Sequence, residues 1–505
     1  MKRTIIALDT DHIKEYVFGT SALKEIRGAS VILDELNRKE MFEVVKKNDP
    51  SAECIYANGG SGMFNVDSDK ADVCISEIRR LYRDKTITGS ISGVRSPEHE
   101  DFSVDFDKTS KLLGARLRMA KDHGNPPLRL VTHSFFCICD SCGVEYAGHQ
   151  GEENTLICPA CMKKRKKNRE IRDDIKAITS GKKTVSEKHK LWDRLLLDYN
   201  TRGRRRPEDF NKLGELSSPS GYIGLLYADG DSMGRRIESL KTVNAYEKFS
   251  KVVDDGIFHA ALKAIQNHLE PKSDSPYFPF DILLLGGDDL VMATVADKAI
   301  EAAMTIIETF QYHTEREWGE PLTVSVGVVI AHAKFPFGTL LKMAEDLLKF
   351  AKKEGTRRSR DYSKRNGQGG LINFQVVSAG NSLRFTEDYN RIFVHKEKKQ
   401  KLIRTLRPYD IQTMELLVKS IREMKSIPHN KIQALQDAVF LNYPDSVLQG
   451  LVIQNRLKKD QKRLLTDVLY SFSTSDNIFP FPWFEEGNAY HTPFLDIAEL
   501  YDFIQ

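Results

Sequence analysis

Two runs of apolar residues each end in a pair of aspartates. The run 223–228 ends in Asp229 and Asp231, and the run 282–285 leads through two glycines to Asp288 and Asp289. Transfer of a nucleotide from a triphosphate develops charge on the attacking and leaving oxygens, which divalent ions about 4 Å apart neutralise. Mg²⁺ prefers carboxylate and phosphate oxygens, so two or three aspartates suffice to hold it. The pattern predicts a nucleotidyl-transfer site with these four aspartates as catalytic residues, in which Asp229, Asp288 and Asp289 hold Mg²⁺ or Mn²⁺.

A Gly-Gly-Asp-Asp sequence by itself also suits a simple turn, because aspartate is common in turns. Three features favour the catalytic interpretation here. Apolar runs flank the sequence on both sides, a second Asp-x-Asp run precedes it, and Ser325-x-Gly327 follows on the next expected strand.

The residues around the aspartates suit a bound triphosphate. Gly286 and Gly287 allow a tight turn and the close approach of a nucleotide to the backbone. Gly230 and Ser232 open an expected helix whose first N–H groups could hold phosphates, although Ser232 equally suits a simple helix cap. Lysines 349, 352 and 353 lie on a later expected helix, from which Lys352 is predicted to reach a phosphate; solvated lysines are the alternative.

The elements around these residues occur twice. An apolar run ending in Asp-x-Asp is found at 5–11 and again at 223–231, and a strand, Gly-Gly turn and strand are found at 54–64 and 282–292. In each copy a helical pattern and another strand follow. The resulting order βαββαβ predicts two ferredoxin-like palm domains. The hairpin of the first copy reads Gly59-Gly60-Ser61-Gly62 and has no carboxylate. We therefore expect a degenerate palm that supports the active one and could bind a nucleotide opposite it.

The expected organisation is an α+β multidomain protein. We place a degenerate first palm at 1–128, a zinc-knuckle and basic helical domain at 129–216, and the catalytic palm at 217–395. The breaker cluster 217–221 marks one boundary. From 396 to 505 the apolar periodicity is helical, which predicts a C-terminal helical bundle.

Five of the seven cysteines lie within one short window. Cys139-x-x-Cys142 and Cys158-x-x-Cys161 have the spacing of two knuckles around one tetrahedral Zn²⁺, and four thiolates close the shell, so the site is expected to be structural. Cys137 and His149 are weaker candidate ligands. Cys54 and Cys74 are expected to be buried as small apolar residues.

Charge and hydropathy narrow the partners. The net charge of +4 does not by itself indicate a nucleic-acid-binding protein, but two dense basic runs stand out at 163–167 and 202–206. They suit either solvated faces or a surface for a phosphate backbone. The sequence has no long apolar run and no secretory signal, so we expect a cytoplasmic protein with no membrane span.

Together these motifs resemble the large subunit of type III CRISPR effector complexes (Csm and Cmr), the CRISPR polymerase family. The segments 8–18 and 23–30 are similar to the first palm of that family. Residues 228–234 and Gly286-Gly287-Asp288-Asp289 match its second palm, the knuckles lie between the palms, and a helical domain closes the chain. The resemblance covers nearly the whole length.

The resemblance implies synthesis of cyclic oligoadenylates from ATP by 3′–5′ linkage at the second palm, as second messengers in antiviral defence. It also implies crRNA, target RNA and other subunits of an effector complex as partners. Many members carry an N-terminal HD nuclease domain, but the palm starts at residue 1 and no His-Asp dipeptide occurs, so we do not expect DNA cleavage. This departure leaves open a stand-alone signalling polymerase.

Two other functions remain open. A cyclic dinucleotide synthase resembling the GGDEF enzymes shares the palm, but the hairpin here reads Gly-Asp-Asp-Leu and both palms lie in one chain. An RNA-binding scaffold subunit with a vestigial palm would tolerate loss of the carboxylates. The intact set of aspartates makes the scaffold the least favoured of the three.

Overall fold

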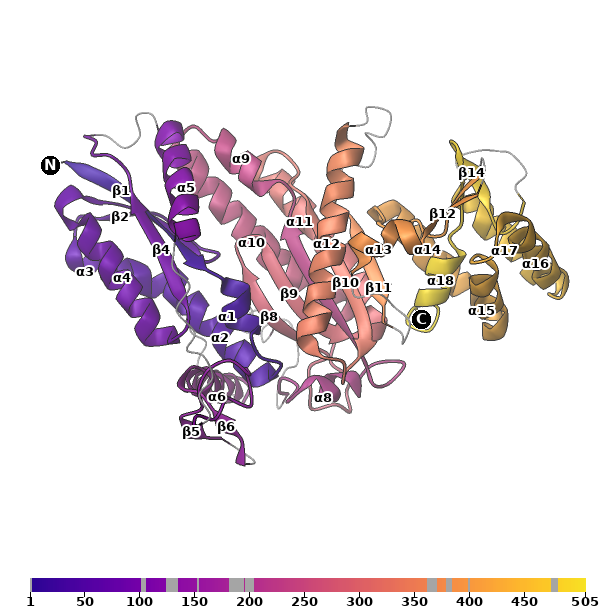
Figure 1. Ribbon diagram of the computed structural model, residues 1–505, viewed down its shortest axis with the longest axis horizontal. Coiled ribbons are helices and arrows are strands. Elements are labelled where there is room, and N and C mark those ends of the chain that lie inside the picture. The colour runs from indigo at the N-terminus through magenta and orange to yellow at the C-terminus, as the bar shows by residue number, and fades with distance from the viewer. Residues whose placement is uncertain are drawn as a thin grey trace.

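The structure, a computed structural model, describes residues 2–100, 106–123, 135–151, 154–180, 195, 204–360, 370–377, 384–397, 400–473 and 480–505. It is a mixed α/β protein with several sheets. Figure 1 shows the first sheet with its helices at the N-terminal end, the second sheet in the middle, and a smaller C-terminal unit beyond it.

The N-terminal part is a four-stranded sheet with helices. Its elements are β1 (Arg3–Asp11), α1 (Ile13–Phe18), α2 (Leu23–Glu35), the π-helical turn η1 (Leu36–Glu40), α3 (Met41–Asn48), β2 (Glu53–Asn58), β3 (Ser61–Asp67), the 3-10 turn η2 (Ser68–Lys70), α4 (Ala71–Thr86), β4 (Ser90–Arg95) and α5 (Phe106–His123). The strand order is β2-β3-β1-β4, with neighbours antiparallel. Helix α4 packs on the face that carries Leu8, whereas Phe106 and Leu113 of α5 pack on Ile5 and Ala7 of the opposite face.

The second sheet repeats this plan and adds a strand. Its elements are β7 (Tyr222–Gly230), α9 (Met233–Ser239), α10 (Val243–His268), β8 (Phe280–Gly286), β9 (Asp289–Val295), the 3-10 turn η5 (Ala296–Lys298), α11 (Ala299–Trp318), β10 (Val324–His332), α12 (Phe337–Arg360) and β11 (Ile372–Val376). The strand order is β11-β10-β7-β9-β8, and β11 runs parallel to β10. β11 was not predicted, because five residues give too short an alternation of apolar and polar residues to identify a strand.

The two faces of the second sheet are covered differently. A Cβ on Gly224 would lie 2.4 Å from Ala299 Cβ, so α11 covers that face together with α10, its packing partner. A Cβ on Gly327 would lie 2.2 Å from Ala344 O, so α12 lies on the opposite face. Gly327 is paired with Tyr227, and side chains alternate along a strand, so the face under α12 is the one that carries Tyr227 and Asp229.

The C-terminal unit differs from the predicted helical bundle. Helices α14 (Ile411–Glu423), α15 (His429–Ala438), α16 (Tyr443–Asn455), α17 (Lys459–Ser471) and α18 (Phe494–Leu500), with the 3-10 turn η7 (Met424–Ser426), agree with the helical periodicity. They are joined by a four-stranded sheet in the order β12-β13-β15-β14, made of β12 (Val394–Glu397), β13 (Gln400–Ile403), β14 (Phe484–Glu486) and β15 (Ala489–His491), and α13 (Phe385–Ile392) precedes it. Strands of three or four residues leave no periodic signal, so the prediction of helices alone was wrong.

The segment between the two large sheets docks on the first one. It contains the short strands β5 (His149–Gln150) and β6 (Leu156–Ile157), the long helix α6 (Pro159–Thr179) and α8 (Phe210–Gly214). Helix α6 lies directly on α2, because a Cβ on Gly28 would come within 1.8 Å of Lys164 O. The close backbone contact leaves no room for a side chain at position 28.

Two residues of the basic run 163–167 point into this contact, whereas Lys163 and Lys166 are exposed. Lys164 and Arg165 are buried. Lys164 Nζ donates to Tyr16 O at 2.5 Å, and Arg165 Nε to Glu25 Oε1 at 2.6 Å. Both predicted roles for this run, a solvated face or a phosphate-binding surface, were therefore wrong for these two residues, because α2 supplies their partners.

The second basic run also makes internal contacts. Residues 202 and 203 lie outside the described residues. Arg206 Nε donates to Asp281 Oδ1 at 2.9 Å, and Arg27 Nε of α2 donates to Asp281 Oδ2 at 2.6 Å. Asp281 is fully buried, and burial lowers the pKa of Arg27 to about 10 against the opposing charge of Asp281. This three-residue ion cluster joins the first sheet, the connecting segment and β8.

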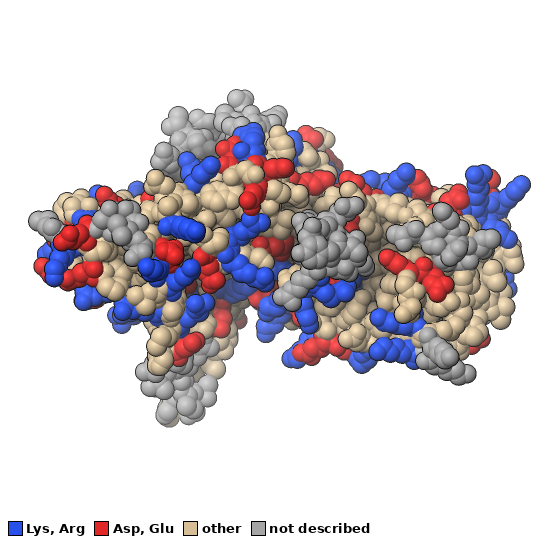
Figure 2. All heavy atoms as spheres, turned by 90° about the horizontal axis from the view of Figure 1, so that it is seen from above, with Lys and Arg blue, Asp and Glu red and all other residues tan. Residues whose placement is uncertain are grey.

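The surface shown in Figure 2 carries charges of both signs. On the face drawn in Figure 2, Lys and Arg side chains are interspersed with Asp and Glu. Among the helices that the structure describes, none is both long and apolar enough to cross a membrane.

Candidate active site

Asp229 is held at the end of the central strand of the second sheet. β7 lies between β9 and β10, and its residues 223–228 are buried, so the strand has little freedom to shift. Asp229 is paired with Ser325 of β10 and its side chain is about one-third exposed. The carboxylate therefore reaches the edge of the sheet on a rigid base.

Asp288 and Asp289 lie at the tip of the hairpin between β8 and β9. Gly286 and Asp289 form its last strand pair, and Gly287 turns the chain with φ +63°, a conformation that favours glycine. A Cβ on Gly230 would lie 2.8 Å from Asp288 Oδ2. The hairpin tip is thus packed against the end of β7, as the sequence predicts for these aspartates.

The three carboxylates repel one another. Burial, together with the charge of Asp229, raises the pKa of Asp288 to about 6. Burial, followed by the charges of Asp229 and Asp288, raises the pKa of Asp289 to about 8. Carboxyl groups that resist joint ionisation are suited to a divalent cation, which would remove the repulsion. The chemistry of these oxygen donors suits Mg²⁺ or Mn²⁺, whose binding here stays a prediction.

Lys352 of α12 is the lysine that reaches this cluster. Its Nζ lies 2.5 Å from Asp229 Oδ2 and donates to Gly230 O at 2.7 Å. Lys349 is instead paired with Glu345 at 3.7 Å and is mostly exposed. Lys352 is thus placed where a phosphate oxygen could replace the aspartate as its partner.

Asp231 is turned toward β10. Its two carboxylate oxygens accept hydrogen bonds from Ser325 Oγ at 2.9 and 3.1 Å, and burial raises its pKa. Ser325 Oγ in turn accepts from the backbone N–H of Leu371, next to β11. Asp231 therefore ties together the ends of three strands, a contact that sequence reasoning missed.

The short helix after Asp231 begins in an unusual way. Ser232 is its N-terminal cap residue, with φ 60°, and its side chain makes no capping hydrogen bond. Ser232 thus occupies the cap position, as the alternative of a simple helix cap predicts, but its side chain does not bind a helix N–H. Its assignment to nucleotide binding stays a prediction.

Gly286 and Gly287 of the hairpin lie close to residues of the first half of the chain rather than facing open space. A Cβ on Gly287 would lie 3.2 Å from Gly59 Cα, and Gly59 also has positive φ, at +56°. The turn residues of the two hairpins thus meet backbone to backbone. Asp254 of α10 accepts the Gly287 N–H at 3.0 Å and is itself bound by Arg38, from the first half of the chain.

The first half also sends a lysine to the second sheet. Lys14 of α1 is paired with Glu345 of α12 at 2.7 Å and lies 4.8 Å from the ring centroid of Tyr227. Burial and then the charge of Asp289 raise the pKa of Tyr227. The sequence motifs do not indicate roles for Lys14, Glu345 or Tyr227, because the meeting of these side chains depends on how the two sheets pack.

The first sheet has a lysine–aspartate pair like that of the second sheet but no carboxylates in its hairpin. Lys121 of α5 is paired with Asp9 Oδ2 at 2.6 Å and donates to Thr10 O at 3.3 Å. This repeats the contacts of Lys352 with Asp229 and Gly230. At the hairpin, Gly60 and Ser61 stand where the second sheet has Asp288 and Asp289.

The four predicted zinc ligands converge. The Sγ atoms of Cys139, Cys142, Cys158 and Cys161 all lie within 4.8 Å of one another. The group includes neither exposed Cys137 nor His149. Elsewhere, Cys74 is buried as expected, whereas Cys54 is exposed, because it lies on β2 at the edge of the first sheet; the prediction for Cys54 was wrong.

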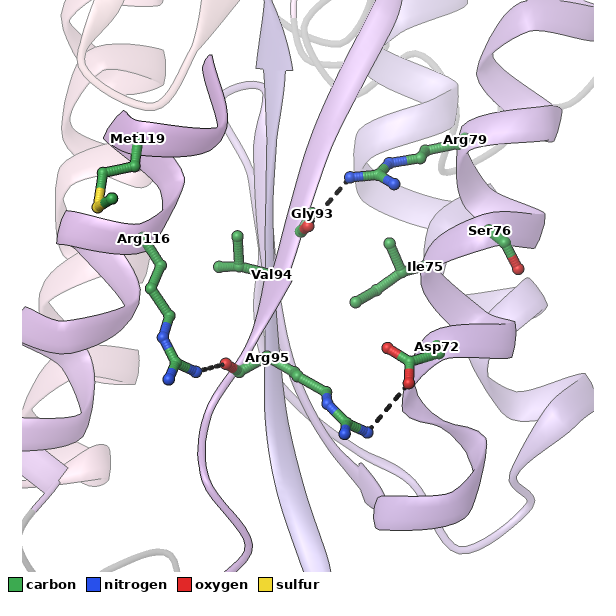
Figure 3. A pocket seen from close by; sticks show the side chains of 9 residues that line it. All are labelled: Asp72, Ile75, Ser76, Arg79, Gly93, Val94, Arg95, Arg116 and Met119. Atoms are coloured by element: carbon green, nitrogen blue, oxygen red, sulfur yellow. Dashed lines mark hydrogen bonds and ion pairs between the residues drawn. The ribbon is translucent and has the colours of Figure 1, made fainter. Parts of the chain in front are cut away.

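A separate cavity of about 500 Å³ lies at the outer edge of the first sheet (Figure 3). Arg79 of α4 donates to Gly93 O at 3.1 Å, and Arg116 of α5 donates to Arg95 O. Arg95 is paired with Asp72 at 3.1 Å. These side chains cover the outward carbonyls of β4, the position that β11 occupies beside β10 in the second sheet.

The sequence and fold match known proteins. Residues 222–360 match the family model described as Cas10/Cmr2, second palm domain, which includes all four aspartates and Lys352. No curated protein sequence matches the chain.

Solved structures share the overall fold. A chain of the Csm1-Csm4 cassette in complex with cA4 aligns with 100% of this chain and 70% of its own length, at a TM-score of 0.54 and 14% identity. Chains of the cassette in complex with AMPPNP and with one ATP align with 89% of this chain and 64% of their own, at TM-scores of 0.50 and 0.51 and identities of 14% and 15%. This chain thus spans 64–70% of the length of these relatives.

Proposed function

We propose that this chain, which carries a Cas10/Cmr2 second palm domain at residues 222–360, is the large subunit of a type III CRISPR effector complex. In that role it joins ATP molecules into cyclic oligoadenylates by 3′–5′ phosphodiester formation at the second palm. The solved relatives support this proposal, since their crystals hold AMPPNP, ATP and cA4 on the same fold. We further propose that both sheets are ferredoxin-like palms, as their βαββαβ order and antiparallel cores indicate.

One observation carries the proposal: three mutually repelling carboxylates meet at the ends of β7 and the β8–β9 hairpin, next to a lysine. Asp229, Asp288 and Asp289 would hold Mg²⁺ or Mn²⁺. When bound, such ions neutralise charge on the attacking and leaving oxygens and favour ionisation of a ribose 3′-OH.

The remaining side chains would position the substrate and the strands. Lys352 would exchange its contact with Asp229 Oδ2 for a phosphate oxygen of the triphosphate. Asp231 and Ser325 would hold the ends of β7 and β10 in place. In the first palm, Lys121 beside Asp9 supports binding of a second nucleotide, although that hairpin has no carboxylates for catalysis.

We assign Zn²⁺ to the four-cysteine cluster, which has the ligand type and convergence of a closed structural site. The partners that follow from the proposed role are crRNA, target RNA and further subunits of the complex.

The test is to incubate the purified chain with each nucleoside triphosphate and Mg²⁺ or Mn²⁺, and to identify products by mass spectrometry. If the chain alone yields none, the assay is repeated with the assembled complex and its guide and target RNA. We expect cyclic adenylates from the wild type and none from the double variant Asp288→Asn, Asp289→Asn. Equal product from a pure double variant would overturn the site. Absence of product from the wild type in the complex would favour a scaffold subunit, and cyclic dinucleotides would favour a GGDEF-like enzyme.

A further inference from the structure

Arg38 crosses from the first palm to the second. It lies in the π-helical turn η1 (Leu36–Glu40) between α2 and α3, and such turns frequently occur at functional sites. Its two terminal nitrogens donate to the two carboxylate oxygens of Asp254 at 2.7 and 2.8 Å. Its Nε donates to Asp34 at 2.6 Å, so a residue of its own palm fixes the guanidinium from the other side.

Asp254 connects this arginine to the hairpin. Its Oδ1 accepts the backbone N–H of Gly287 at 3.0 Å. Gly287 immediately precedes Asp288 and Asp289 and turns the chain at φ +63°. A continuous path of hydrogen bonds therefore runs from the first palm through Asp254 to the backbone that carries two of the three clustered carboxylates.

We propose that Arg38 is a positioning residue, which through Asp254 and the Gly287 amide fixes the Asp288–Asp289 hairpin tip and so makes the second palm's site dependent on the docking of the first. The proposal rests on the proposed function only in taking this hairpin as the catalytic one.

Geometry distinguishes Arg38 from an ordinary ion pair at an interface. Exposed pairs between flexible side chains contribute little to stability and specify little geometry. Here the Arg38–Asp254 contact is bidentate, which fixes orientation, and the Asp254 side chain is only 16% exposed. Next to this contact the glycine turns of the two hairpins pack closely, since a Cβ added to Gly287 would lie 3.2 Å from Gly59 Cα, so a shift of one palm against the other would move the hairpin tip.

Hydrogen exchange of the full chain tests the positional part without any substrate. In Arg38→Ala and in Asp254→Ala, a peptide that covers residues 284–290 should exchange at least about tenfold faster than in the wild type, because the Gly287 amide loses its fixed acceptor. The matched control is Ser250→Ala. Ser250 lies one turn before Asp254 on α10 and contacts Asn58 of the first palm at 3.2 Å, so this variant removes a cross-palm hydrogen bond without touching Gly287.

Kinetics and ion binding test the functional part. Because a misplacement of about 1 Å can lower a rate about a hundredfold, we expect Arg38→Ala to lower kcat between about tenfold and a hundredfold, with KM for ATP within about threefold. Affinity for Mn²⁺ should fall in the same variant, Arg38→Lys should recover part of both losses, and Ser250→Ala should lose neither.

Unchanged exchange at 284–290 in Arg38→Ala would overturn the proposal, as would a raised KM with unchanged kcat. If the wild-type complex makes no nucleotide product, the proposed function fails; exchange and Mn²⁺ affinity then still decide whether Arg38 positions the hairpin.

Discussion

At the scale of single residues, the carboxylate cluster is a place where the fold holds like charges together. A buried strand carries Asp229 and a glycine turn precedes Asp288 and Asp289, and the three carboxyl groups lie close enough to affect one another's pKa. Burial, followed by repulsion from the neighbouring carboxylates, raises the pKa of Asp289 to about 8 and that of Asp288 to about 6. Without bound cations, these carboxyl groups therefore lower the free energy of unfolding.

This predicts a specific dependence of stability on pH. An exposed aspartate titrates near pH 4, so between about pH 4 and pH 8 the folded chain keeps a proton on Asp289 that the unfolded chain has released. The stabilising contribution is complete below about pH 4 and is lost as the pH rises through 8. With EDTA present, Asp289→Asn should flatten this fall and exceed the wild type at pH 8 by at least about 1 kcal/mol.

Urea unfolding of both proteins between pH 5 and 9 measures the difference. Mn²⁺ should then stabilise the wild type more than Asp289→Asn, because only the wild type gains a full set of ligands. Parallel pH profiles of the two proteins would show that Asp289 is not held at a raised pKa.

Residues with a motif could be found from the sequence, and residues without one could not. The spacing of the aspartates led to their cluster, and Lys352 was placed on the right helix. Arg38 and Asp254 were missed because they are 216 positions apart and meet only through packing of the two halves. The burial of Lys164 and Arg165 was also missed, because local composition does not show which face of α6 lies on α2.

At the scale of elements, the two sheets differ in how their outer edge is closed. β10 is paired with β11, whereas the outward carbonyls of β4 are covered by Arg79 and Arg116. Charged side chains over an edge strand hinder pairing with another copy. The same plan thus ends in a strand in one half and in side chains in the other.

Removing both arginines should expose that edge. We expect Arg79→Ala with Arg116→Ala to self-associate at concentrations where the wild type has one size, as measured by light scattering after gel filtration. The matched control is Arg80→Ala with Arg118→Ala, which removes two exposed arginines from the same helices outside the cavity. Equal behaviour of both double variants would show that net charge, not edge protection, matters.

The cysteine cluster gives a second prediction at this scale, on zinc binding and stability. Cys139→Ser should reduce bound zinc from about one ion per chain to nearly none and lower thermal stability, because a closed site needs its fourth thiolate. Cys137→Ser is the control, since that cysteine is exposed and outside the cluster. Zinc content by elemental analysis decides; loss of zinc in the control would make Cys137 a ligand.

Long elements were predictable and short ones were not. Strands β1 and β7 follow the long apolar runs that end in Asp-x-Asp, and the structure has them where the sequence indicates. β11 and the C-terminal sheet were missed because each strand has five residues or fewer. The strand after the first hairpin, β4, begins at Ser90, since Ile87 adopts φ 68° where α4 ends.

At the scale of the whole molecule, Asp281 joins the two halves. Its carboxylate accepts hydrogen bonds from Arg27 of α2 and from Arg206. The side chains of Arg27 and Asp281 have almost no exposed surface. Asp281→Ala would leave two buried guanidinium groups without this carboxylate, and breaking a buried ion pair in this way costs about 3–5 kcal/mol.

We therefore expect Asp281→Ala to unfold at lower denaturant concentration and to become sensitive to proteolysis between the two halves. Asp274→Ala, an exposed aspartate before the same strand, should behave like the wild type. A change below about 1 kcal/mol in Asp281→Ala would mean that water replaces the carboxylate and that the halves are held by apolar packing alone.

The repeated pair of a lysine with an aspartate, Lys121 with Asp9 and Lys352 with Asp229, has a consequence for descent. Two facing copies of one fold in a single chain are what results when the gene of a homodimer is duplicated and the two copies fuse. In a homodimer every substitution appears twice, so a hairpin cannot gain or lose its carboxylates on one side alone. Once both copies lie in one chain they can diverge, and Gly60 and Ser61 opposite Asp288 and Asp289 are the divergence that such a fusion permits.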